Sequence, residues 1–403
     1  MAFQSASNIL VALKRETTEG VIISAGSGTR LRITDSPGLV LTRAVVQSNE
    51  KRADGLKTLG RLGYKGVSGS YNAELSTGGG NDILLEAIMR AAFVAAATRT
   101  YDNSAGLTSL EVTQTNEITQ VGTTTLVGVI YVGDVIRLAG MSNAANNDLN
   151  LRVTGVTATV ITVAGTPLTV QVADVACTLT RLKRVSTAAA PTNYSHSIEQ
   201  YDQDIDLSEV FLGCHVSGVR ISCRPGEMAT VVYTFVGMSR TAFETGTSPY
   251  FTTPTLSTTR ALIADDSSIR MNGAEVTKFT GFELDFQIAM QGTPVIGSLV
   301  TPTVFANDLT MSGQITGLRE DFANLTLYDA ETEFELSILL QEPSGAPKEC
   351  LSLFLPVVKI GALSAPVGGG DGGKIETLPL MVGPKTAATG YLGTIAMISS
   401  SAA

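Results

Sequence analysis

The alternation of apolar and polar side chains changes its period within residues 61–96. Residues 61–74 follow the period of two that a half-buried strand requires. Three glycines, Gly78, Gly79 and Gly80, then interrupt the strand pattern. Beyond them one apolar stripe recurs at helical spacing and contains Ile83, Leu84, Ala87, Ile88, Ala91 and Ala92. The pattern predicts a strand and then a helix, capped by Asn81 or Asp82, that packs against a sheet.

The same order of elements returns, more loosely, after residue 308. Each copy has a strand with a central Ser-Gly pair, which is Ser68-Gly69 in the first copy and Ser312-Gly313 in the second. In the second copy a short helix is expected at 320–328, followed by a return strand. Few residues are identical between the copies, so the hypothesis of an internal duplication rests on the order of the elements.

Residues 107–185 interrupt the first copy with a series of short strand patterns. Turn signals such as Asn146-Asn147-Asp148 separate these strands at the spacing of a small sandwich or barrel. The expected fold is therefore mainly β, with an inserted domain. The expected segments are 1–103 and 188–262 for the two parts of the first repeat, 104–187 for the inserted all-β domain, and 263–403 for the second repeat and a C-terminal tail.

The composition narrows the class of protein. Hydrophobic residues make up 44% of the chain, and no apolar run reaches the ~18 residues of a membrane span, so we expect a folded protein without a transmembrane helix. Charged residues are only 16%, below the roughly 25% of ordinary domains, which suggests that copies of the chain cover much of its surface. The net charge of −9 argues against binding of nucleic acid through phosphates, because such binding needs clustered Lys and Arg.

Residues that could carry chemistry are few. The chain has four cysteines, no CxxC spacing and only two histidines, so a zinc site is not expected. Cys214 and His215 are adjacent on an expected strand and would point to opposite faces, which disfavours a catalytic pair. The loop at 368–374, GGGDGGK, satisfies GxxxxGK, but Ile375 stands where a phosphate-binding loop needs Ser or Thr. We expect no metal, no cofactor and no enzymatic activity.

Several stretches together resemble the tail tube, or major tail, proteins of long-tailed bacteriophages of the siphophage type. They are SNILVALKRETTEG, NEKRADGLKTLGRLG, SGSYNAELSTGGGNDILLEAIMRAAF, SHSIEQYD and VSGVRISCRPGEMATVVYTFVG. The stretch GDVIRLAGMSNAANNDLNLRVTGV is similar to the accessory β domains that decorate such tubes. The resemblance implies tail-tube β-sandwich repeats with flanking helices, whose inner sheets close into a β-barrel ring, and rings that stack head to tail into a hollow tube.

The resemblance also implies the partners. The protein would be a structural part of the virion tail, assembled in the host cytoplasm without a membrane partner. It would bind copies of itself, the tape measure protein, and the tail terminator and tail-tip proteins, while genomic DNA would pass through the lumen without specific binding. If the duplication holds, three chains form a pseudo-hexameric ring, and six chains are the alternative. A different interpretation is a tail-tip or host-surface module that binds glycans, which the absence of Trp disfavours.

Two groups of charged residues are the candidate contacts of the assembly. The first group lies in one loop and is expected to join stacked rings: Glu50, Lys51, Arg52, Asp54, Lys57 and Arg61. The second group belongs to an acidic run that lacks the spacing of a calcium loop, and it is expected at the lumen or the ring interface: Glu199, Asp202 and Asp204. An acidic lumen would keep DNA from adhering to the tube wall.

Overall fold

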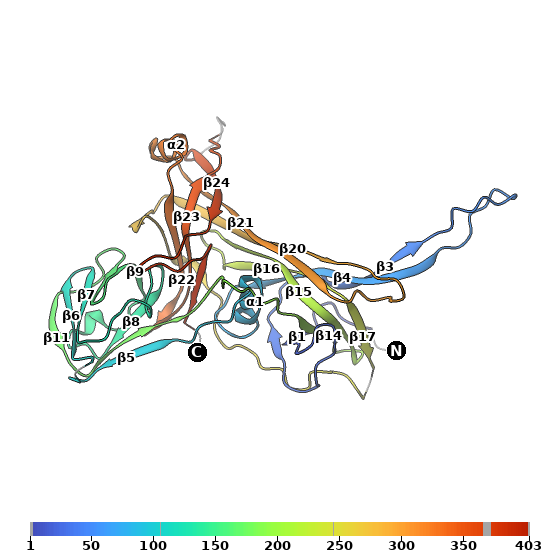
Figure 1. Ribbon diagram of the computed structural model, residues 1–403, viewed down its shortest axis with the longest axis horizontal. Coiled ribbons are helices and arrows are strands. Elements are labelled where there is room, and N and C mark those ends of the chain that lie inside the picture. The colour runs from blue at the N-terminus through green and yellow to red at the C-terminus, as the bar shows by residue number, and fades with distance from the viewer. Residues whose placement is uncertain (1–2, 105, 245, 366–371, 402–403) are drawn as a thin grey trace.

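The computed structural model describes residues 3–104, 106–244, 246–365 and 372–401. This part of the chain is mainly β, as the sequence predicted, and its strands form a large sheet and a smaller one (Figure 1). Every pairing between two strands of these sheets is antiparallel. Among the described residues, neither α-helix is long and apolar enough to cross a membrane.

The two ends of the chain build the same arrangement twice. The first repeat contains β1 (Ile9–Arg15), β2 (Thr29–Leu31), β3 (Gly38–Val46), β4 (Arg61–Glu74), α1 (Gly79–Met89), β14 (His196–Asp202), β15 (Leu207–Cys223), β16 (Thr230–Gly237) and β17 (Ser239–Phe243). The second contains β18 (Ile263–Met271), β19 (Ala274–Glu275), β20 (Phe279–Gly292), β21 (Val304–Leu318), α2 (Ala323–Asp329), β22 (Phe334–Gly345), β23 (Lys348–Ile360), β24 (Ile375–Gly383) and β25 (Met397–Ser400).

The strand pairings are equivalent in the two repeats. The first repeat is hydrogen-bonded in the order β2-β1-β14-β15-β16-β4-β3. The second follows the order β19-β18-β22-β23-β24-β21-β20. The last strand of each repeat, β17 or β25, returns to the first half of the long strand β15 or β23. This agreement supports the duplication that the sequence suggested.

An in-chain seam joins the repeats edge to edge. Strand β15 of the first repeat pairs with β20 of the second, from Gly218 opposite Gln287 to Cys223 opposite Phe282. The result is one continuous sheet in the order β3-β4-β16-β15-β20-β21-β24-β23, which we call the long sheet. Among the described residues this sheet does not close into a barrel, because its β3 edge has no strand partner.

One apolar core lies behind the long sheet and extends through both repeats. A row of cross-strand neighbours on this side is almost fully buried: Tyr71, Tyr233, Val219, Phe286 and Met311. Helix α1 packs into the same core through Leu84, Leu85 and Ile88. Outer strands such as β1 and β14 add Leu13 and Ile198, so the core is enclosed from both sides.

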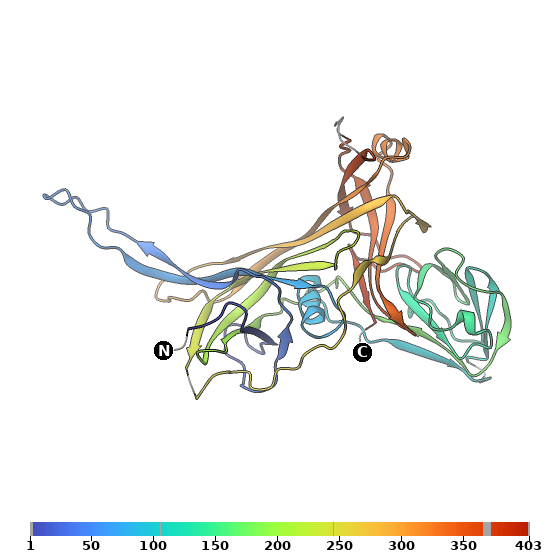
Figure 2. The same cartoon turned by 180° about the vertical axis from the view of Figure 1, so that it is seen from behind.

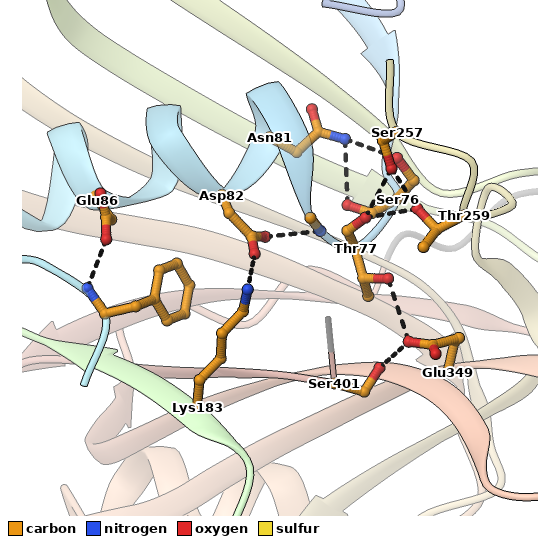
Figure 3. Close-up of polar contacts among 12 residues, drawn as sticks. Ser76, Thr77, Asn81, Asp82, Glu86, Lys183, Ser257, Thr259, Glu349 and Ser401 are labelled. Carbon is orange, nitrogen blue, oxygen red and sulfur yellow. Dashed lines mark hydrogen bonds and ion pairs between the residues drawn. The ribbon is translucent and has the colours of Figure 1, made fainter. Parts of the chain in front are cut away.

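Helix α1 begins earlier than the sequence predicted. Its N-cap is Gly78, whose φ of 79° favours glycine, so the expected cap at Asn81 or Asp82 was wrong. Figure 3 shows what these two side chains do instead. The Asp82 carboxylate accepts the Gly78 N–H at 3.0 Å and pairs with Lys183 at 2.7 Å, a placement that the positive end of the helix dipole favours.

The segment before α1 also binds the second repeat. The Thr77 hydroxyl lies 3.4 Å from Glu349, whose carboxylate is shared with Ser401 (Figure 3). The Thr77 carbonyl accepts hydrogen bonds from the hydroxyls of Ser257 and Thr259 in the connection between the repeats. The start of α1 is therefore a polar junction of both repeats and their linker.

A smaller sheet forms the inserted domain, and it begins earlier than expected, at Ala97. Its elements are β5 (Ala97–Tyr101), β6 (Ser109–Gln114), β7 (Glu117–Val121), β8 (Val135–Ala139), η1 (Ala144–Asn146), β9 (Leu151–Val156), β10 (Val160–Val163), β11 (Gln171–Asp174) and β12 (Cys177–Arg181). Strand β13 (Lys183–Ser186) leads back to the large sheet, where it pairs with β25. The inserted domain has its own apolar core.

The inserted domain interrupts the first repeat but packs against the second. Arg152 donates hydrogen bonds to Ser337 of β22 and Ser268 of β18. Asn150 donates to the Lys348 carbonyl at 3.1 Å. Gly133 lies so close to Phe354 that an added Cβ would come within 2.2 Å of its ring. The inserted domain is therefore held against the second repeat by these hydrogen bonds and by the close packing of Gly133 on Phe354.

The Ser-Gly pairs mark equivalent close approaches within the long sheet. A Cβ added to Gly69 would lie 2.0 Å from the Gly38 carbonyl oxygen of β3, and φ at Gly69 is +155°. A Cβ added to Gly313 would lie 2.7 Å from the Glu283 carbonyl oxygen of β20. In each repeat glycine lets the hairpin strand approach closely.

We predict that Gly69→Ala destabilises the protein by about 2 kcal/mol or more, because the new methyl group must displace the β3 backbone. Ser68→Ala, which changes the exposed neighbouring side chain, is the control and is expected to cost at most about 0.5 kcal/mol. Chemical denaturation measures both. Equal stability of the two variants would contradict the close approach.

Candidate functional site

The face of the long sheet opposite the core is polar. One row crosses six strands in register, through Asn72, Val232, Arg220, Asp285, Ser312 and Met381. A neighbouring row contains Glu74, Thr230, Ser222, Glu283, Gln314 and Pro379. All of these side chains are exposed or half-buried. We call this surface the polar face, and both repeats contribute to it without a break.

The polar face is acidic. Its carboxylates are Glu74, Glu283, Asp285 and Asp308. Arg220 lies among them, 3.0 Å from Asp285 and 3.4 Å from Glu283, and so bridges β15 to β20 across the in-chain seam. The hydrogen bond from Arg220 to Asp285 raises the pKa of the guanidinium. Lys359 of β23 continues the first row opposite Met381 and pairs with Glu333 at 3.5 Å. Two ion-paired cations among several carboxylates leave this surface unsuited to holding a phosphate backbone.

The β3 edge of the long sheet is capped by a side chain. The Leu39 N–H donates to Gln200 Oε1 at 2.9 Å, and Tyr71 donates its hydroxyl to the same oxygen at 2.8 Å. The equivalent residue of the second repeat, Leu284, lies opposite Ile221 in the in-chain seam. Gln200 therefore accepts the hydrogen bond of the Leu39 N–H, on the edge that in the second repeat is paired with the neighbouring strand β15.

The opposite edge of the long sheet follows β23. Here the chain continues to pair with β24, since Ser364 and Thr377 exchange hydrogen bonds at 3.0 and 2.8 Å. Gly361 donates to the Pro379 carbonyl at 2.8 Å. Residues 361–365 correspond to the part of β15 that forms the in-chain seam in the first repeat. Their outer side has no strand partner in the described chain.

The loop expected to join rings lies at the tip of the β3–β4 hairpin, which projects far from the body (Figures 1 and 2). Glu50, Lys51, Asp54 and Lys57 are exposed, and so is Arg61 at the base of the loop. Arg52 pairs with Asp54 of the same loop at 2.6 Å. Leu59 is 96% exposed, so the tip is apolar as well as charged.

The three predicted acidic residues of the second group are separated by the fold. Glu199 is 1% exposed and differs from the expectation, because its carboxylate accepts the backbone N–H groups of Tyr250 at 2.6 Å and Phe251 at 2.9 Å. Burial and the nearby Glu209 raise the pKa of Asp202. Asp204 is exposed and binds the N-terminal segment, accepting from Ser5 at 2.8 Å and Asn8 at 2.5 Å.

The residues weighed for other chemistry are structural in this fold. All four cysteines are free and buried, and burial raises the pKa of Cys214 well above its usual value. No cluster of three or more His, Cys, Asp or Glu able to hold a metal ion occurs in the part of the chain that the structure describes. Residues 366–371, which contain most of the GGGDGGK motif, lie outside the described residues.

The carboxylates of the polar face were missed at the sequence level, although β20 carries a local signal for them. Phe282, Leu284 and Phe286 alternate with Glu283, Asp285 and Gln287, which is the period of a strand with one buried and one solvated face. The Gln200 cap has no such signal, because its partner Leu39 lies far away in the sequence.

A comparison with protein-family models finds one that matches residues 6–382, and its description is phage tail tube protein. The match covers the first repeat, the inserted domain and the second repeat as far as β24. No curated protein shows significant similarity to the chain.

We predict that His196 makes the protein less stable as the pH falls below 6.5. Burial lowers the pKa of His196 in the folded protein to about 3, with a smaller effect from Arg15, so the unfolded chain takes up a proton that the folded chain excludes. The loss from this histidine is about 2 kcal/mol between pH 6.5 and 5. Asp134, whose pKa burial raises to about 6, takes up a proton in the same range with the opposite effect on stability, and it does so in the unaltered protein and in the variant alike. Denaturation of His196→Met should lack this component. The same pH slope in both proteins would contradict it.

Proposed function

The chain belongs to the phage tail tube protein family, and from this premise we propose that three copies close their long sheets into one ring whose polar face lines a DNA channel. The protein is a structural component of the phage tail. The observation that carries the proposal is the in-chain seam, because it joins two equivalent repeats in the way that neighbouring copies would be joined.

The polar face supports the assignment of the lumen. It is the only side of the long sheet free of the apolar core among the described residues, and it spans both repeats. Its carboxylates repel the phosphates of passing DNA, while its Ser and Thr hydroxyls keep the wall hydrated. Such a wall lets DNA slide without specific binding.

The in-chain seam also supplies a register for the seam between copies. Gly361 and Gly218 are equivalent because they lie opposite Pro379 and Thr234, which occupy the same place in the two repeats. Ser364 lies opposite Thr377, which corresponds to Val232, the partner of Arg220. Ser364 therefore corresponds to Arg220, with one extra residue between it and Gly361. Val40 corresponds to Asp285 because they lie opposite Ser68 and Ser312. We therefore place Ser364 of one copy opposite Val40 of the next. Gln200 would then release the β3 edge to the arriving strand.

Three chains suffice for a pseudo-hexameric ring because each supplies two repeats. Closure of the sheet removes the unpaired β3 edge, which would otherwise invite uncontrolled pairing. A ring of six chains is the alternative, and it requires a lumen lined by twelve repeats. The tape measure, tail terminator and tail-tip proteins are the proposed further partners.

The remaining parts follow from the ring. The β3–β4 hairpin, with the charged loop at its tip, is proposed to reach a neighbouring ring in a head-to-tail stack (Figure 2). The inserted domain packs on β18 and β22, away from the polar face, and is proposed to decorate the outside of the tube.

We predict that the double variant Val40→Cys, Ser364→Cys forms disulfides between chains and yields a covalent trimer under oxidising conditions. Opposed residues of antiparallel strands have Cα atoms within the range that a disulfide spans. The control is Arg220→Cys, Asp285→Cys, which should close a disulfide within one chain and leave the mass of a monomer. The native cysteines are buried and should stay reduced. Non-reducing electrophoresis and end-on electron microscopy provide the readouts.

Threefold rings with a covalent trimer would support both the ring and the register. Threefold rings without the cross-link would overturn the register but keep the ring. Sixfold rings of six chains would replace the trimer, and chains that form no ring under any condition would overturn the proposed function.

We predict that changing Glu74 and Asp308 to Lys makes assembled tubes retain double-stranded DNA; both residues lie on the polar face and neither pairs with Arg220. For two added phosphate contacts, the affinity should fall roughly 12-fold between 50 and 200 mM salt. The control carries the same charge change on the inserted domain, at Glu111 and Glu117. Nuclease protection of the retained DNA reports whether it lies inside. Equal protection by both variants would show that the polar face does not line the lumen.

A further inference from the structure

The hairpin tip and its stem form a surface unlike the rest of the chain. Residues 43–65, which we call the arm, contain six basic and two acidic residues, whereas the whole chain has a net charge of −9. Leu56 and Leu59 are 65% and 96% exposed, and Val45 and Val46 on the stem are also exposed. The arm is therefore an apolar, basic projection that meets the second repeat at its base, where the Lys65 N–H donates to the Leu299 carbonyl at 2.7 Å, and extends from the body at its tip (Figure 1).

An exposed apolar patch lies at the other end of the long sheet. Leu318, at the end of β21, lies opposite Ile375 of β24, and both side chains are exposed. Phe322, just before α2, is 67% exposed. Residues 318–335 contain six acidic residues and one basic residue, Arg319, which lies over the Phe322 ring at 5.1 Å. Lys278 pairs with Glu320 and Asp321, so the net charge of this region is negative but partly balanced. We call the patch and these residues the far end.

The arm and the far end cannot meet within one chain. Four antiparallel pairings connect β4 to β21, so the two strands run in the same direction. The arm precedes β4 and the far end follows β21, and they lie at opposite ends of the long sheet in both views (Figures 1 and 2). A contact between them requires a second copy displaced along the strands.

The charges of the two surfaces have no counterpart in the other repeat. The hairpin loop of the second repeat, residues 293–303, also exposes apolar side chains, among them Ile296, but it contains no charged residue. In the first repeat the helix equivalent to α2 is α1, which is mostly buried beneath the sheet, whereas the only fully buried residue of α2 is Asn324. Each chain therefore has one arm and one far end.

We infer that the arm of one copy docks on the far end of a copy in the adjacent ring. This inference rests on the proposed function and adds the receiving surface. The two surfaces match in charge and both expose apolar side chains, so their contact buries apolar area and pairs opposite charges. A threefold ring offers three arms and three far ends, so adjacent rings dock only in orientations related by thirds of a turn.

Charged residues that already form an ion pair within their own chain are less available for a contact between chains. Arg52 is paired with Asp54, whereas Lys51 and Lys57 make no ion pair among the described residues. At the far end Glu320 and Asp321 lie near Lys278, and Glu333 lies near Lys359. Asp329 and Glu331 are exposed and make no ion pair among the residues that the structure describes. These four residues are the ones to exchange.

The test is a charge exchange in the full-length chain, measured by sedimentation of tubes and by tube length in electron micrographs. Lys51→Glu with Lys57→Glu, and separately Asp329→Lys with Glu331→Lys, should each raise the concentration needed for tubes about tenfold or more, because every ring interface repeats the contact three times. Combining all four changes restores opposite charges and should restore tubes. Glu111→Lys, on the inserted domain, is the control and should assemble normally.

The outcomes separate this inference from the proposed function. If both double variants form rings and these rings still stack normally, the proposed contact is overturned and the ring proposal stands. Loss of stacking that the fourfold variant fails to restore would also overturn it, because the arm would then bind another surface. Absence of rings in the unaltered protein would overturn the proposed function, and the docking inference with it.

Discussion

The pairing of β15 with β20 is the constraint on which the other features of this protein depend. It fixes the register of two repeats within one sheet, and a slip by one residue would turn every side chain of a repeat to the wrong face. Contacts on both faces oppose such a slip. Val219 and Phe286 meet in the core, and Arg220 meets Asp285 on the polar face. The continuity of the polar face follows directly from this register.

Two carboxylates of one N-terminal segment fix neighbouring parts of the chain. Glu16, which is buried, accepts hydrogen bonds within the first repeat from Ser197 and from the Gly213 N–H, both at 2.9 Å. Glu19, which is half-buried, joins the repeats because it accepts from Thr303 and from the Val304 N–H at the start of β21. Burying a carboxylate is costly unless donors surround it, and the donors around Glu16 offset this cost.

The features that could be predicted from the sequence are those that depend on the spacing of residues within one strand or helix. The apolar stripe at residues 83–92 predicted helix α1, although the helix ends at Met89, before Ala91 and Ala92. The Ser-Gly pairs identified equivalent strands, and in both of them glycine allows two backbones to approach closely. The burial of Glu199 could not be predicted, because its hydrogen-bond donors come from residues 250–251, a distant segment without periodicity. The helix cap was misplaced because a backbone in the left-handed region, at Gly78, outweighed the side chains that usually cap helices. The polar face was predictable in part, from the alternation within β20.

The duplication has a consequence for counting. A chain that carries two equivalent repeats in one covalent unit can build only rings with an even number of repeats. Rings of five or seven repeats therefore cannot form, whatever the energy of the seams. Half of the seams in any such ring are made during the folding of each chain, at no cost in translational freedom. In a three-chain ring, only three seams depend on the encounter of separate molecules, and errors of ring size are correspondingly fewer.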